Sequence, residues 1–173
     1  MSPRGDEIPA WRVRLQAAVP AGILATLTMD GAMAAAAVFG GAAFAADRLG
    51  IGMIGRWAAG LAQGRWRARD VSREPPERGE AALGLLVHYA TGVALTEVYV
   101  LLSPARARPS VTAATCYGAA TAVLPLLIMF PSMGYGAFGR RSGEAGTLLR
   151  VMGVGHVAFG IGIGIWTRRA LRR

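Results

Sequence analysis

The chain has 173 residues, of which 53% are hydrophobic, and it carries a formal net charge of +9. Its single cysteine, Cys116, excludes an intrachain disulfide and a cluster of thiolate metal ligands. A strong positive charge is typical of nucleic-acid-binding proteins. Here, however, every basic residue is arginine, and the arginines lie between or beyond long apolar stretches. We therefore exclude a nucleic-acid partner and expect one membrane domain.

Four apolar stretches each approach the length that crosses a bilayer, at residues 17–46, 81–102, 111–130 and 147–167. A helix needs about 20 apolar residues to cross a hydrocarbon core of about 30 Å. Helices satisfy their own backbone polar groups in lipid, so each stretch is predicted to be a spanning helix. The first stretch is longer than the core of a signal peptide and contains Asp30, so we expect it to be retained.

The connection between the first two stretches, residues 47–80, is long and rich in arginine. It places Ile54, Trp57, Ala58 and Leu61 at helical spacing, which predicts a short interfacial helix over residues 53–63. The prediction is an all-α membrane protein. It has a polar tail (1–16), a four-transmembrane-helix bundle (17–167) with the interfacial helix in its first connection, and a basic tail (168–173). The arginines divide almost equally between the two sides of the membrane, so their count does not decide the orientation.

Four ionisable side chains fall within the predicted spans: Asp30, His88, Glu97 and His156. Each costs about 2.5–3.5 kcal/mol at bilayer depth, so each is expected to have a partner or a function. Asp30 shares a helix face with small residues, which indicates that it faces the bundle and pairs with a histidine or an arginine. Glu97 lies near a helix end, where we expect it to reach the interface or to pair with an arginine such as Arg106.

The two histidines lie at similar depths in helices that enter the membrane from the same side. Three interpretations stay open. Each ring bonds a neighbouring helix and fixes packing, both rings relay protons, or both hold haem b between them. Apart from the haem alternative we predict no metal and no cofactor, because two imidazoles without a carboxylate at their level make a poor zinc site. The candidate buried polar line comprises Asp30, His88, His156, Glu97 and Tyr99.

Glycines in the spans are the candidate packing residues, because small residues let membrane helices approach closely. We assign this role to Gly84, Gly92, Gly160 and Gly164. The chain contains no nucleophile elbow, phosphate-binding Walker loop, zinc-protease motif or paired catalytic carboxylates, so we predict no enzyme activity. The predicted partner is the lipid bilayer. The small-residue faces leave open a homo-oligomer or a structural role in a larger membrane complex.

Several short motifs follow one another along the chain in a characteristic order: Thr28-Met29-Asp30, Gly55-Arg56-Trp57, Gly64-Arg65-Trp66, Gly84 to Gly92, Pro131 to Gly136, and His156 to Gly160. Over about residues 20–165 this order resembles a family of small bacterial inner-membrane proteins of unknown function. The resemblance implies four helices in the bacterial inner (plasma) membrane, and it implies no activity or cofactor. Our leading hypothesis is a transport-type or accessory membrane protein with a buried polar line that relays protons.

Overall fold

The computed structural model describes residues 9–39, 50–104 and 109–172, and these residues contain helices and no strands. In chain order the elements are α1 (Ala10–Phe39), α3 (Ile51–Ala62), η1 (Val71–Arg73), α4 (Glu80–Leu102), α5 (Val111–Thr121), η2 (Pro125–Met129), α6 (Phe130–Ser132), η3 (Ala137–Gly139) and α7 (Ala145–Ala170). Four segments are long and apolar enough to cross a membrane, namely α1, α4, the run from α5 to α6, and α7. The predicted fold, four long apolar helices with a short helix after the first, is confirmed.

The first helix begins earlier than the sequence indicated. Helix α1 starts at Ala10, within the predicted polar tail, while residues 40–46 of the predicted span lie outside the described residues. Arg14 explains the early start, because its guanidinium donates to the carbonyls of Val100 and Ser103, at 2.9 and 3.1 Å. Carbonyls at a helix C-terminus lack partners within the helix. Arg14 therefore holds the first turns of α1 against the end of α4.

The third span is interrupted part-way along. Helix α5 ends at Thr121, and the π-helical turn η2 begins at Pro125. Proline lacks a backbone N–H and clashes with the preceding turn, so a helix widens or bends there. The predicted helix over residues 111–130 is therefore a broken helix that continues to Ser132.

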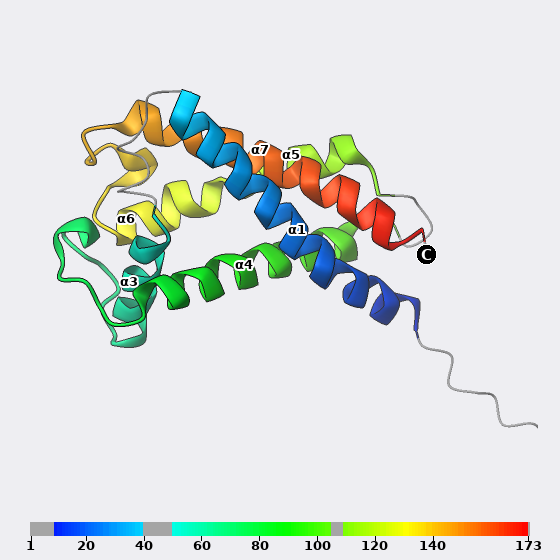
Figure 1. The fold of residues 1–173 in the computed structure, drawn as a ribbon, viewed down its shortest axis with the longest axis horizontal. Coiled ribbons are helices and arrows are strands. Elements are labelled where there is room, and N and C mark those ends of the chain that lie inside the picture. The colour runs from blue at the N-terminus through cyan, green and yellow to red at the C-terminus, as the bar shows by residue number, and fades with distance from the viewer. Residues whose placement is uncertain (1–8, 40–49, 105–108, 173) are drawn as a thin grey trace, which may run out of the picture.

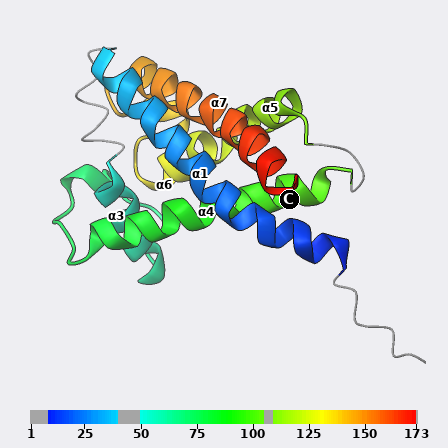
Figure 2. The same ribbon diagram turned by 45° about the vertical axis from the view of Figure 1, so that its right-hand side comes forward.

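Helix α7 packs between α1 and α5, and α4 packs against α1 and α3. Figures 1 and 2 both show α1 and α7 lying side by side along their length. Glycines permit this approach: a Cβ on Gly162 would lie 2.8 Å from Cα of Ala25 in α1, and one on Gly164 would lie 2.7 Å from Cα of Val111 in α5. Close backbone approach at small residues is the usual source of helix association in lipid.

Helix α3, the segment that leads from it to α4, and the segment between the third span and α7 gather at one end of the bundle, opposite the start of α1 and the C-terminus (Figure 1). We call this part the cap and define it as α3 with residues 63–79 and 130–144. Its two halves are joined at Ser132, whose Oγ accepts a 2.9 Å hydrogen bond from the Trp57 indole and whose carbonyl accepts a 2.8 Å bond from the amide of Ala68. The cap is thus a packed unit.

Candidate functional site

Asp30, in the second half of α1, is held by two adjacent side chains of α4. Its Oδ1 lies 2.8 Å from Nε2 of His88, and its Oδ2 accepts a 2.9 Å hydrogen bond from the hydroxyl of Tyr89. An ionised carboxylate only accepts hydrogen bonds, so Nε2 of His88 carries the proton of the first bond. Each oxygen of Asp30 has a partner, yet 39% of the side chain is still exposed.

His156, on α7, is 6% exposed and bonds a different helix. Its Nδ1 lies 3.0 Å from Oγ1 of Thr121 in α5. The Thr121 hydroxyl donates its single proton to the carbonyl of Gly118, at 2.6 Å. The proton in the bond between Thr121 and His156 therefore belongs to Nδ1 of His156. The second ring nitrogen, Nε2, is then unprotonated.

Both polar groups line one cavity of about 420 Å³. Helices α1, α3, α4 and α7 form its walls, together with the chain from Thr121 to Met133. Most of the lining is apolar, and its ionisable members are Asp30, His88 and His156. A mainly apolar cavity with a few polar groups is the usual form of a small-ligand site.

The rim of this cavity reaches the outer surface of the bundle. Three lining residues, Leu85 on α4 with Leu124 and Ile128 near η2, are 49%, 37% and 60% exposed. Exposed aliphatic side chains on a spanning helix face lipid tails. The cavity therefore opens sideways, between α4 and the broken part of the third span.

The structure brings together part of the predicted polar line. Asp30, His88 and His156 line the same cavity, whereas Glu97 and Tyr99 do not. The buried Tyr99 hydroxyl donates to the carbonyl of Ser110, at 2.9 Å, near the opposite end of α4. Glu97 is half-buried on α4, and its suggested partner at position 106 lies outside the described residues.

The two imidazoles have separate partners within the cavity wall. Nε2 of His88 is bonded to Asp30, and Nδ1 of His156 is bonded to Thr121. Ligation of haem through Nε2 of His88 would require this ring to give up its bond to the carboxylate. Haem between the two rings stays a prediction. Among the described residues there is also no group of three or more His, Cys, Asp or Glu side chains suited to a metal ion.

The four candidate packing glycines all lie where helices meet closely. A Cβ on Gly84 would meet the backbone of α3, and one on Gly92 would meet the Thr26 side chain of α1. A Cβ on Gly160 or Gly164 would meet the backbone of α5. These contacts set the rotation of α4 and α7, which turns His88 and His156 toward the cavity.

Sequence reasoning missed two polar partners and one apolar pattern. Tyr89 was overlooked beside His88, and Thr121 gave no signal because its role depends on the end of α5. The apolar pattern is a set of methionines: five of the chain's seven methionines line the cavity. The sequence did carry a signal for it, because four of these five form pairs spaced four residues apart. The cavity-lining methionines are Met29, Met33, Met129, Met133 and Met152.

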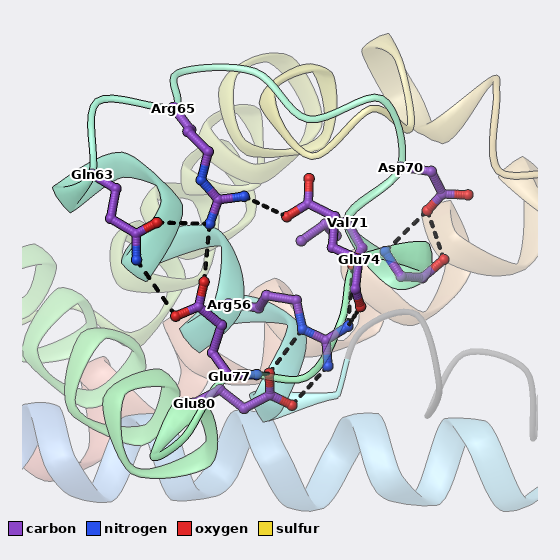
Figure 3. A network of polar contacts seen from close by, with 9 residues as sticks. Arg56, Gln63, Arg65, Asp70, Val71, Glu74, Glu77 and Glu80 are labelled. Atoms are coloured by element: carbon purple, nitrogen blue, oxygen red, sulfur yellow. Dashed lines mark hydrogen bonds and ion pairs between the residues drawn. The ribbon is translucent and has the colours of Figure 1, made fainter.

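A second polar network lies in the cap, and Figure 3 shows it around Arg56. The guanidinium donates to both carboxylate oxygens of Glu80, each at 2.8 Å, and to the carbonyls of Glu74 and Val71, at 2.8 and 3.2 Å. The bonds to Glu80 raise the pKa of Arg56 above its ordinary value, although burial opposes this. Arg56 therefore stays charged and ties α3 to the start of α4.

Comparison with known proteins places the chain in a family. The model of one family, DUF2938, matches residues 19–170. The chain belongs to this family. Its description reads "protein of unknown function". No curated protein and no solved structure matches the chain.

Proposed function

We propose that this member of DUF2938 is a small transport-type membrane protein that binds its solute in the cavity. One observation carries the proposal: Asp30, His88 and His156 line a single cavity formed by apolar spanning helices. Ionisable residues inside spans are costly, and they mark ion pathways and proton relays. Two helix-packing histidines would not need a common cavity.

The roles of the three residues follow from their bonds. Asp30 supplies a negative charge that its two hydrogen-bond donors leave 39% exposed. His88 contacts that carboxylate directly, so a proton can pass between them without a conformational change. His156 presents an unprotonated nitrogen, which accepts a proton or binds a solute.

The proposal extends to the setting of the protein. The four candidate spans are helices, which favours the bacterial inner (plasma) membrane that the family resemblance implied. The cavity supplies binding groups, and we propose a non-catalytic role for it. Binding and movement of a solute, rather than its conversion, is the proposed activity.

Proton movement in reconstituted vesicles tests the proposal. Purified protein would be placed in liposomes that enclose a pH-sensitive dye, and a potassium diffusion potential would drive protons inward. We expect wild-type vesicles to acidify faster than empty vesicles, and Asp30→Asn to return the rate to that of empty vesicles. Glu144→Gln, which removes an exposed carboxylate at the start of α7, should keep the wild-type rate. Acidification no faster than in empty vesicles, or an Asp30→Asn rate equal to wild type, would overturn the proposal.

A further inference from the structure

We infer that the cavity binds a soft monovalent metal ion, Cu(I) or its analogue Ag(I), through methionine thioethers and His156. The inference deepens the proposed function, on which it rests for movement of the ion, by naming the solute. Soft thioether sulfur favours Cu(I) over harder ions, and imidazole is also a good copper ligand. The cavity offers five thioethers and two imidazoles.

The contact between α1 and α7 brings the first donors together. Gly155 leaves a notch on α7, and Met33 of α1 fills it: Sδ of Met33 lies 2.8 Å from the position that a Cβ on Gly155 would take. Met152 is the helix neighbour of both Gly155 and His156, because residues three and four apart lie close together on a helix. The Met33 sulfur thus lies against the turn of α7 that carries Met152 and precedes His156.

Further thioethers lie in the same part of the structure. Met133 and Met152 belong to one buried cluster in which they are 1% and 5% exposed, and Met33 and Met129 pack against that cluster. Met29 lies one turn before Met33, and its Cγ is 3.4 Å from the same Gly155 position. We assign Met33, Met152 and His156 as ligands, with the remaining thioethers beside them.

The hydrogen bonds of His156 suit a metal ligand. A ligating histidine usually donates its other ring N–H to a protein oxygen, which fixes the tautomer and the ring orientation. Nδ1–H of His156 donates to Thr121 in this way and leaves Nε2 with a free electron pair. Asp30, in the same cavity, supplies the negative charge that a monovalent cation needs in an apolar setting.

The binding test uses Ag(I), which needs no reductant. The exposed thiol of Cys116 would also bind silver, so the parent protein is the untagged full chain with Cys116→Ser. Titration in detergent and chloride-free buffer, with silver counted by mass spectrometry after desalting, should give one ion per chain. Met33→Leu together with Met152→Leu keeps the volume of the core. Loss of a group that only supports a metal ligand weakens binding by at least about tenfold. We expect the loss of two ligands in this double variant to weaken silver binding by at least that much.

Met53→Leu is the matched control. Met53 packs against the same cluster as Met33 but does not line the cavity, so silver binding should equal that of the parent protein. X-ray absorption of the silver-loaded parent protein, which needs no core variant, should detect sulfur neighbours. Absence of silver binding, equal affinity in the double variant, or a shell of nitrogen and oxygen alone would overturn the inference. Binding without proton flux would remove the transport proposal only, and flux without binding would remove the metal site only.

Discussion

The cap and the cavity both hold charged side chains away from water, but they use their hydrogen bonds differently. In the cap, Arg56 is 4% exposed and donates to Glu80 and to two carbonyls. In the cavity, Asp30 remains 39% exposed and His156 has an unprotonated Nε2. Both regions contain a carboxylate with a close hydrogen-bonded partner, and the second carboxylate lines the cavity.

This difference separates structural from functional charge in the fold. A buried charge whose donors all have partners inside the protein fixes the positions of the segments that it joins. A polar group with an unused bonding position, facing a cavity, keeps that position for a ligand. The two regions should therefore respond differently when a polar group is removed.

The largest effect is expected in the cap. Arg56→Met leaves the carboxylate of Glu80 without its main partner, and breaking a buried pair in this way costs about 3–5 kcal/mol of unfolding free energy. Thermal unfolding in detergent micelles measures the loss. Arg65→Met is the control, because Arg65 forms exposed ion pairs with Glu74 and Glu77 that are worth at most about 1 kcal/mol. Equal losses from the two variants would refute the structural role of Arg56.

An intermediate effect is expected where helices meet beside the cavity. Gly160→Ala places a Cβ against the backbone of α5, and overpacking of this kind costs about 1–3 kcal/mol. Gly153→Ala, on the same helix, meets nothing within 4 Å and should leave the unfolding midpoint almost unchanged. If both variants unfold at the same temperature, α5 and α7 do not pack as described.

The smallest effect is expected at the aspartate. Tyr89→Phe removes one of two hydrogen bonds to Asp30. A hydrogen bond to a charged group is worth about 1.5–3 kcal/mol, and the exposure of Asp30 lowers the expected loss to about 1 kcal/mol of unfolding free energy. Asp30 stays partly exposed and keeps His88, so the loss should remain well below that of Arg56→Met in the same unfolding assay. A loss as large as in the cap would mean that the cavity groups serve stability.

The fold could be predicted because lipid restricts the choices. Span length and the need to satisfy backbone polar groups leave helices as the solution for residues 81–102 and 147–167. The early start of α1 could not be predicted, since it depends on the bonds of Arg14 to the far end of α4. The break in the third span was visible only as Pro125, which permits a kink without specifying a π-helical turn.

The site could be predicted only in part, because helix rotation decides which side chains meet. The cost of burial identified Asp30, His88 and His156, all of which line the cavity. Tyr89 lies about 100° around α4 from His88, so helical periodicity places it on another face. Only the bridging carboxylate of Asp30, with one oxygen for each partner, brings Tyr89 into the site.

The cavity holds one histidine engaged by a carboxylate and one with an unprotonated ring nitrogen. The chain contains two histidines, so nitrogen NMR of protein labelled at histidine gives a spectrum that can be assigned with one substitution, His88→Gln. We predict a proton on Nε2 of His88, a proton on Nδ1 of His156, and a shift of the His156 Nε2 signal when Ag(I) is added. A protonated Nε2 on His156, unchanged by silver, would contradict the account.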